Sequence, residues 1–371
     1  MKFSCEKADL AAAVTIASRA AAAKSAVPSL EGLLIEAGSD IIVTGFDLKT
    51  GIRSTIKADV SEPGSVVINA RLFGDIIRKL PDDVIYLSVN EKYMINIRCA
   101  MSEFDIMGIS AEEYPDLPSV DYQNSVYMKE RDIKAMIAET NFAVSDNEAR
   151  PIHTGALFEV ENDILTVVAV DGFRLALRRE RVAKTEVGKV SFVVPGTALS
   201  EVEKIAGDSE DLVKITLGSK HVMFTLGPNM LISRRLEGEF LNYRNSIPQT
   251  SKYSIELSRR DLINTVERVS LIINEKFKSP IRCAFGDNVL RVSTAATLGK
   301  AVDECGVSGD GEGLEIGFNN RYILEALRAA PADSVRLQLS TSVSPCVIVP
   351  TDGSKNFLYM ILPVRLRANE N

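Results

Sequence analysis

The chain carries the same pattern three times, and this threefold repeat limits its fold more than any other feature. In each copy a short alternating segment is followed by two or three polar residues and an amphipathic stretch with helical spacing. The equivalent aspartates are Asp9, Asp132 and Asp261. Since both spacings between them are close to one third of the 371 residues, the repeat fills the chain.

A second pattern also recurs once in each third: a strand-like run, a tight junction and a short helix-like run. The three copies are Val66–Leu80, Phe192–Ile205 and Leu314–Leu327. Strand-like runs separated by turn residues follow each helix-like run. Each third is therefore predicted to hold about two helices and two groups of strands. This is an α+β fold with helices on one side of mostly antiparallel sheets.

The boundaries of helices and domains follow from the same reading. Apolar spacing predicts six helices, at residues 7–24, 71–79, 129–143, 197–206, 258–273 and 319–330. Polar segments that contain proline, at 113–124 and 240–252, separate the thirds. We therefore predict three tandem domains, at residues 1–122, 123–250 and 251–371.

Charge is distributed unevenly along the chain. With 43 basic and 50 acidic residues the net charge is −7, which on its own argues against a generally basic nucleic-acid coat. The six predicted helices, however, hold 15 basic and 10 acidic residues, so they carry +5 and the remainder −12. One interpretation is an ordinary solvated helix surface. The other is a positive surface that contacts phosphates without reading base sequence, because the helices lack interleaved aromatic residues.

Known catalytic signatures are absent from the sequence. It contains no phosphate-binding loop, no dinucleotide-binding glycine pattern and no nucleophile elbow. The two histidines, His153 and His221, lie in separate strand-like runs without an adjacent nucleophile, and we predict neither a metal nor a cofactor. Two alternatives stay open: a carboxylate–metal enzyme acting on nucleic acid, and a repeat scaffold that binds only proteins.

The cysteines indicate a reducing environment. They are odd in number, five, and form no CxxC pair, which predicts reduced and mostly buried thiols. The first residues lack the apolar core of a secretory signal, and no run is long enough to span a membrane. We therefore expect a soluble cytoplasmic protein without a membrane partner.

Seven short motifs occur in an order that resembles the DNA polymerase III β subunit family, the bacterial replicative sliding clamps. They are Met1–Phe3, Thr44–Leu48, Arg150–Phe158, Val170–Ala176, Asn274–Lys278, Ile316–Tyr322 and Leu362–Leu366. Each motif alone is weakly specific, but their order and spacing cover the whole length. The resemblance implies a non-catalytic processivity subunit. Two copies would form a head-to-tail ring of six clamp domains around duplex DNA, with sheets outside and helices lining the hole.

The resemblance also implies which residues contact DNA and which join two copies. Ten basic side chains are candidates for sequence-independent phosphate contacts. They are Lys24, Arg71, Arg78, Lys79, Arg131, Lys134, Arg150, Arg259, Arg260 and Arg268. The homodimer junction would pair edge strands, with Phe104 and Ile106 of one copy facing Leu271 and Ile272 of the other. An ordinary place in the core is the alternative for these four residues.

Members of this family bind partner peptides in a pocket between their second and third domains. The partners are the DNA polymerase III catalytic subunit, the clamp loader, other polymerases and repair proteins. The matching positions are His153, Gly155, Val170, Gly172, Phe173, Arg174, Leu175, Leu241, Pro345, Met360, Ile361, Leu362, Pro363, Val364, Arg365 and Leu366.

Some positions depart from the family pattern at this pocket. His153 stands where an apolar residue is usual, Leu241 replaces a proline, and Asn245 and Ser246 replace a basic–apolar pair. Arg367–Asn371 extend past the usual end of the chain. We therefore expect the pocket to persist with an altered peptide preference.

Overall fold

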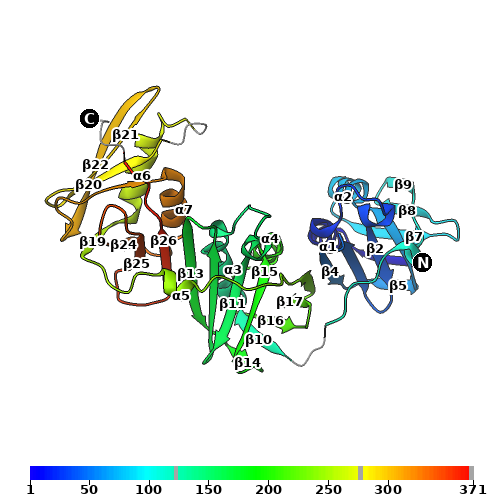
Figure 1. The fold of residues 1–371 in the computed structure, drawn as a ribbon. Helices are drawn as coiled ribbons and strands as arrows, with labels where there is room; N and C mark the ends of the chain where they lie inside the picture. Colours follow the sequence, from blue (N-terminus) through cyan, green and yellow to red (C-terminus); the bar gives the residue numbers. More distant parts are fainter. Residues whose placement is uncertain (121–123, 275–278, 367–371) are drawn as a thin grey trace. The chain divides into compact units, whose positions relative to one another are not determined.

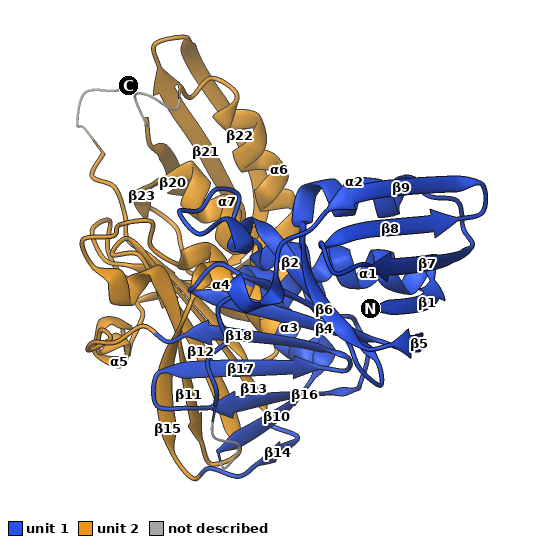
Figure 2. Cartoon of the chain, turned by 90° about the vertical axis from the view of Figure 1, so that its right-hand side faces the viewer, with its two compact units in different colours: residues 1–134, 182–187, 200–235 blue, residues 135–181, 188–199, 236–371 orange. Residues whose placement is uncertain are grey.

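The computed structural model describes residues 1–120, 124–274 and 279–366. Contacts divide the chain into two compact units, which Figure 2 colours separately. Unit 1 comprises residues 1–134, 182–187 and 200–235, and unit 2 comprises residues 135–181, 188–199 and 236–371. Each unit therefore contains residues from more than one of the predicted thirds.

Unit 1 contains a five-stranded antiparallel sheet made entirely from the first third (Figure 1). Its strands, in spatial order, are β5 (Asp59–Glu62), β1 (Lys2–Glu6), β7 (Val84–Val89), β8 (Met94–Cys99) and β9 (Ser102–Met107). Successive side chains of a strand point to opposite faces. Accordingly Phe3, Leu87 and Ile97 are buried in a core, while their neighbours are more exposed.

A second sheet in unit 1 has nine antiparallel strands. In spatial order these are β14 (Lys184–Thr185), β10 (Ser125–Lys129), β16 (Leu212–Leu217), β17 (His221–Leu226), β18 (Asn229–Arg234), β4 (Thr50–Ile56), β3 (Ile41–Phe46), β2 (Gly32–Ala37) and β6 (Gly64–Asn69). Pairing of β18 with β4, for example Leu231 with Ile52, joins strands of the first and second thirds. One ladder thus crosses the predicted domain boundary.

Two helices pack between these sheets in the first third, α1 (Lys7–Ala17) and α2 (Ala70–Lys79). Leu10 and Phe73 enter the same core as residues of both sheets. Asn69 precedes α2 and its side-chain oxygen accepts the Leu72 N–H at 3.0 Å, which satisfies a free donor of the first turn. Short 3₁₀ segments of this unit are η1 (Ser18–Ala20), η2 (Pro28–Glu31) and η3 (Ala111–Glu113).

Unit 2 is built on a twelve-stranded antiparallel sheet. In spatial order its strands are β15 (Val190–Pro195), β11 (Gly155–Glu161), β12 (Ile164–Val170), β13 (Arg174–Arg181), β26 (Phe357–Ile361), β25 (Cys346–Pro350), β24 (Ser334–Leu339), β19 (Tyr253–Ser258), β22 (Gly299–Gly309), β21 (Val289–Ala296), β20 (Ile281–Phe285) and β23 (Glu315–Phe318). Here β13 pairs with β26, so strands of the second and third thirds share one ladder.

The remaining helices belong to unit 2 or contain residues of both units. Unit 2 contains η4 (Asn141–Ala143), η5 (Pro151–Thr154), α5 (Tyr243–Ser246), α6 (Arg259–Ser270) and α7 (Asn320–Ala329). Figure 1 shows α6 and α7 side by side, and their first turns are capped by Ser258 and Asn319. Residues of α3 (Glu130–Ala138) and α4 (Gly196–Ile205) belong to both units. The predicted α+β architecture with antiparallel sheets is confirmed.

All six predicted helices are present, but four are shorter than predicted, two of them by six residues or more. The helix predicted at 7–24 ends at Ala17, because the chain turns back and the Ala22 N–H donates to the Leu30 carbonyl at 2.9 Å. Lys24 lies in this loop, so its placement on a helix was wrong. The helix predicted at 129–143 ends at Ala138.

The shorter helices also change the charge count. Within the observed bounds the six helices hold 12 basic and 9 acidic residues, a net charge of +3 instead of +5. Some basic residues that were counted as helical therefore lie outside the helices, such as Lys24 in a loop and Lys129 in β10.

The cysteine prediction is confirmed, since all five thiols are free and buried. Burial raises the pKa of Cys5 to about 12 and that of Cys305 to about 11, so both stay protonated at neutral pH. Among the helices that the structure describes, none is both long and apolar enough to cross a membrane.

Gly45 in β3 tests how closely the end of α1 packs against the sheet. A Cβ atom at Gly45 would lie 2.0 Å from the Ala17 carbonyl oxygen, whereas one at the turn residue Gly38 would meet nothing within 4 Å. We expect Gly45→Ala to lower the free energy of unfolding by about 1–3 kcal/mol, because a backbone segment must move. Gly38→Ala is the control, with a change within about 0.5 kcal/mol. Equal urea midpoints for the two variants would contradict this packing.

Candidate nucleic-acid interface and apolar surface site

Four neighbouring strands of unit 2 form a continuous apolar row. The register pairs Val170 of β12 with Leu175 of β13, Leu175 with Met360 of β26, and Met360 with Val347 of β25. All four side chains are buried in one cluster. Directly paired residues point to the same face of a sheet. The row therefore joins predicted pocket residues that lie far apart in the sequence.

The short helix α5 is held firmly beside this row. Tyr243 belongs to the same cluster, and its hydroxyl donates to the Glu159 carboxylate at 2.6 Å. The Arg244 guanidinium donates to the same carboxylate at 2.8 Å and lies 4.6 Å from the centre of the Tyr243 ring. Burial and the Glu159 carboxylate raise the pKa of Tyr243, so the phenol remains protonated. Asn245 and Ser246, two departures from the family pattern, occupy the last turn of this helix.

Exposed apolar side chains stand next to the ends of these strands. Phe173 is 59% exposed immediately before β13, and Leu241 is 45% exposed two residues before Tyr243. Val364 follows β26, and Val343 is exposed in the loop before β25. Sequence reasoning missed Val343, which matches no motif. A buried apolar row with exposed apolar neighbours is suited to bind an apolar peptide segment.

The remaining predicted pocket residues occupy loops or strand ends. Gly155 begins β11, Ile361 ends β26, and Pro345 lies in the loop before β25. Beyond β26, Leu362 donates its N–H to the Phe173 carbonyl at 2.8 Å, and Val364 donates to the Gly317 carbonyl at 2.8 Å. The segment Leu362–Leu366, which includes Pro363 and Arg365, is thereby fixed beside the row at both points.

His153 is placed differently from the prediction. It lies in η5 and not in a strand, and its ring contacts Phe240 edge to face at 5.3 Å. Burial, and to a lesser extent Arg150, lower its pKa, so the imidazole is neutral at pH 7. His221 lies in β17 of unit 1. In the described part of the chain, no three His, Cys, Asp or Glu residues are grouped to hold a metal ion.

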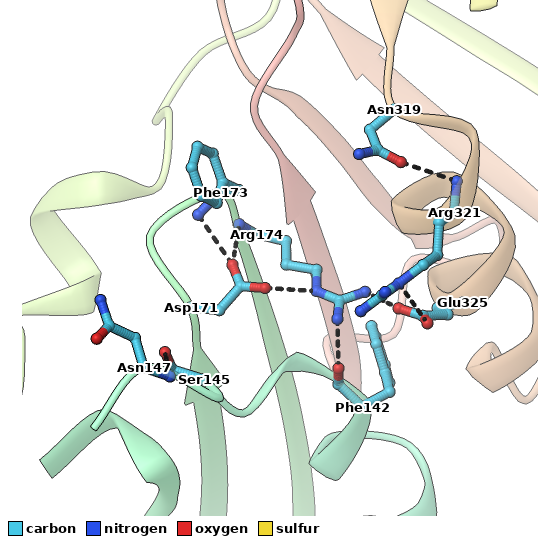
Figure 3. Close-up of polar contacts among 9 residues, drawn as sticks. All are labelled: Phe142, Ser145, Asn147, Asp171, Phe173, Arg174, Asn319, Arg321 and Glu325. Atoms are coloured by element: carbon cyan, nitrogen blue, oxygen red, sulfur yellow. Dashed lines mark hydrogen bonds and ion pairs between the residues drawn. The ribbon is translucent and has the colours of Figure 1, made fainter. Parts of the chain in front are cut away.

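The turn before β13 is organised by Asp171. Its carboxylate accepts the N–H groups of Phe173 at 2.9 Å and Arg174 at 3.1 Å, as Figure 3 shows. Gly172 has φ 91°, a conformation that favours glycine, which explains the Asp-Gly-Phe-Arg order of the motif. This turn projects the Phe173 ring outward while Arg174 points inward.

Arg174 connects the central third of the chain to α7 within unit 2. Its guanidinium donates to Asp171 at 2.9 Å and to the Phe142 carbonyl at 2.6 Å, and forms an ion pair with Glu325 (Figure 3). It also lies 4.5 Å from the centre of the Tyr322 ring. Only 4% of the side chain is exposed. Arg174 therefore acts in this structure as an internal support for the strand that carries Leu175.

A second buried ion pair lies on the same strand. Arg178 of β13 is 2.7 Å from the Glu139 carboxylate, and also pairs with Glu180. Burial of the Glu139 carboxyl outweighs the attraction of Arg178 and raises its pKa to about 7. This glutamic acid therefore titrates near neutral pH.

The candidate DNA contacts in unit 1 fall into two groups. Lys24, Arg71 and Lys79 are exposed and make no ion pair with the residues that the structure describes. In the second group, carboxylates already pair with the cations. Arg78 contacts Asp75 at 3.1 Å, Arg131 contacts Glu210 at 2.5 Å, and Lys134 contacts Asp208 at 3.0 Å. A phosphate would have to compete with these carboxylates.

The candidates in unit 2 show the same division. Arg150 and Arg260 are exposed and have no ion-pair partner in the described part of this unit. Arg268 pairs with Asp303. Arg259 is half-buried and donates to the Leu327 carbonyl at 3.3 Å, so it closes the last turn of α7. Counting charges in the sequence could not separate the unpaired cations from those that carboxylates already pair.

The candidate junction residues lie at a free sheet edge and at the end of a helix. Phe104 and Ile106 belong to β9, which pairs only with β8 among the described strands. Leu271 follows α6 and is 81% exposed, whereas Ile272 is half-buried. Val302 of β22 is a further exposed apolar residue that the sequence analysis did not select. The segments Arg367–Asn371 and 275–278, part of the Asn274–Lys278 motif, lie outside the described residues.

Comparison with known proteins agrees with the motifs. Models of the DNA polymerase III beta subunit match three consecutive segments: the N-terminal domain at residues 1–118, the central domain at 127–242 and the C-terminal domain at 244–365. The chain belongs to the DNA polymerase III beta subunit family. Its members are sliding clamp processivity subunits and not catalytic enzymes, so the predicted absence of catalytic activity is confirmed.

Individual relatives cover nearly the whole chain. The beta sliding clamp of Staphylococcus aureus is 32% identical over 358 residues, which is 94% of both chains. The crystal structure of the DNA polymerase sliding clamp from Bacillus subtilis has a TM-score of 0.94 at 31% identity, and the match covers 99% of this chain and 100% of that one. A Pseudomonas aeruginosa sliding clamp bound to griselimycin gives a TM-score of 0.94 at 25% identity with the same coverage. The predicted three tandem clamp domains are confirmed.

Replacing Arg174 should reveal its supporting role. Arg174→Ala leaves Asp171 and Glu325 without their buried counter-charge, and we expect the free energy of unfolding to fall by about 3–5 kcal/mol. Arg321→Ala is the matched control, because Arg321 pairs with the same Glu325 at 3.1 Å from an exposed position. We expect its effect to stay below about 1 kcal/mol. Similar losses for both variants in denaturant titrations would show that Arg174 contributes only as a surface ion pair.

The raised pKa of Glu139 predicts a pH dependence of stability. The folded chain binds this proton more tightly than the unfolded chain, whose glutamate has the ordinary pKa of 4.5. The stability that Glu139 contributes is therefore complete below pH 4.5 and is lost as the pH rises through about 7. We expect Glu139→Gln to flatten the dependence of the unfolding free energy on pH in this window. If the unfolding free energy of Glu139→Gln, measured by urea titration at several pH values, depends on pH as steeply as that of the wild type, the assignment is contradicted.

Proposed function

We propose that two copies of this chain close head to tail into a ring around duplex DNA and hold the replicative polymerase on its template. The observation that carries this proposal is the match of three clamp-domain models, in order, along almost the entire chain. The ring would hold DNA by its closed form, so each phosphate contact can be weak and independent of base sequence. We propose boundaries for the three clamp domains at 1–122, 123–250 and 251–371. The first two contain the matches at 1–118 and 127–242, whereas the third match, 244–365, begins seven residues before the proposed third domain.

The free edge of β9 supports the proposed ring. An exposed strand edge is a template for pairing with another chain, and a head-to-tail contact that closes gives a ring. Phe104 and Ile106 on this edge would face Leu271 and Ile272 of the second copy. The exposure of Phe104 and Leu271 favours an interface over an ordinary place in the core.

The apolar row supports the proposed tethering role. We place the partner peptides of the DNA polymerase III catalytic subunit, the clamp loader, other polymerases and repair proteins against Val170, Leu175 and Met360. Phe173 and Leu241 would form part of the rim. Such peptides would raise the effective concentration of their enzymes at the DNA. The five buried free thiols accord with a place in the cytoplasm.

Retention on DNA tests the proposal directly. We expect the protein to stay on closed circular DNA and to leave the same DNA after it is cut once. A scaffold that binds only proteins would be retained on neither form. Equal retention on both forms would reject a ring held by its topology.

The two groups of cations predict which charges matter. Reversing the three unpaired residues Lys24, Arg71 and Lys79 to glutamate should lower the salt-dependence slope of binding to short linear duplex by about three. Reversing Arg78, Arg131 and Lys134 is the matched control. It should have a smaller effect on the slope, because carboxylates already neutralise these residues. Equal slopes for both triple variants would show that the internal ion pairs do not limit phosphate contact.

A further inference from the structure

One end of the nine-stranded sheet gathers basic residues from three segments that are distant in sequence. The Arg234 N–H donates to the Lys49 carbonyl at 3.2 Å, and the Arg235 N–H donates to the Lys220 carbonyl at 2.9 Å. His221 of β17 lies directly opposite Arg234 of β18. We define the basic edge surface as Lys49, Lys220, His221 and Arg234, all within unit 1.

The three cations of this surface take part in no ion pair among the described residues of unit 1. In the described part of unit 1, Lys49, Lys220 and Arg234 are exposed and make no ion pair. The nearby Asp47 carboxylate accepts the N–H groups of Lys49 at 2.9 Å and Thr50 at 2.6 Å, so it caps the turn. The grouping therefore contributes no ion pair to the stability of unit 1.

Leu48 adds an apolar element at the tip of the same turn. It has φ 72°, a conformation uncommon for residues other than glycine, and 58% of the side chain is exposed. Strain of this kind is often associated with a functional contact. The turn thus presents an apolar side chain beside Lys49.

The basic edge surface faces away from the helix α1. His221 and Arg234 lie on the same face of the sheet as Met223 and Ile232. On this face Val120, which precedes β10 in the chain, packs against Met223 and Ile232. The opposite face of the neighbouring strand β4 carries Ile56, which packs against the core that contains Leu10 of α1. In the ring of the proposed function the helices face the DNA. The basic edge surface is then on the outside, where the encircled duplex does not reach it.

We propose that the basic edge surface and Leu48 form a second docking site for partner proteins, one that binds an acidic segment carrying an apolar residue. Carboxylates of the segment would neutralise Lys49, Lys220 and Arg234, and its apolar side chain would cover Leu48. Charge complementarity of this kind mainly raises the association rate and the specificity. The outward position of the site rests on the proposed function, whereas the charge and the exposed leucine do not.

The two histidines of the chain make this proposal measurable. NMR titration can follow His221 in the site and His153 in unit 2 as an internal control. Burial, Arg234 and Lys220 lower the pKa of His221 in the free protein. The probe is a twelve-residue peptide of alternating Glu and Asp with one central leucine. We expect the bound peptide to raise the pKa of His221 and to leave that of His153 unchanged. No change at His221 would overturn the proposal.

Variants separate the charge from the leucine. Lys220→Glu should weaken binding of the probe by about tenfold. Lys92→Glu, at an exposed lysine of the β7–β8 turn, is the matched control and should leave binding within about twofold. Leu48→Asn keeps a residue that tolerates positive φ, so it should fold normally and bind the probe more weakly. Equal affinities for wild type, Lys220→Glu and Leu48→Asn would reject the site.

A DNA control distinguishes this proposal from the proposed function. We expect Lys220→Glu and Leu48→Asn to remain on circular DNA as well as the wild type does. A loss of retention would place the surface in the path of DNA and overturn the assignment to a protein partner. A 20-base-pair duplex that changes the pKa of His221, when the peptide does not, would also overturn the assignment to a protein partner. If the wild type is not retained on circular DNA, the proposed ring is rejected. The docking site is then tested by the peptide titration alone.

Discussion

Hydrogen-bonded ladders between strands of different repeats are the interaction on which the rest of this structure depends. Pairing of β18 with β4 continues one sheet across the first boundary, and pairing of β13 with β26 does so across the second. Each ladder satisfies backbone groups that an isolated repeat would leave at a sheet edge. The apolar row of Val170, Leu175 and Met360 exists only because the second ladder is formed.

Buried charges then fix the strand that carries this row. Arg174 has partners on three segments of unit 2, and Arg178 has two carboxylates within reach. Such groups stabilise a fold only when every partner is in place, because an unpaired buried charge is strongly unfavourable. They therefore define one position for β13 relative to α7. The buried side chains of Arg174 and Arg178 therefore also fix the position of the surface that partners would contact.

The electrostatic pattern suits a protein that moves along DNA. Four of the ten candidate cations are already paired with carboxylates, among them Arg131 with Glu210 and Arg268 with Asp303. Five others, including Lys24 and Arg71, make no ion pair with the described residues and would be free to contact phosphates. Weak and uniform contacts do not hold a complex at one position, so the closed form of a ring and not its affinity would determine how long it stays bound.

The sequence by itself determined the three repeats, the α+β class, the starts of the helices and the burial of the cysteines. These features depend on local periodicity and on capping residues such as Asn69 and Ser258, which act within one turn. The family resemblance also selected three of the four members of the apolar row, Val170, Leu175 and Met360, but not Val347. The sequence did not predict where α1 ends, since that depends on a hydrogen bond between Ala22 and Leu30 after the chain has turned back.

Only the tertiary structure decided how the repeats combine and which charges are free. Strand pairing between repeats joins residues such as Leu175 and Met360, and no local period records the partner of an edge strand. Whether an arginine is unpaired depends on carboxylates brought near by folding, so Arg71 and Arg78 look alike in the sequence and differ in the structure. Local propensities determine the elements, whereas contacts between distant segments determine the surface that a partner meets.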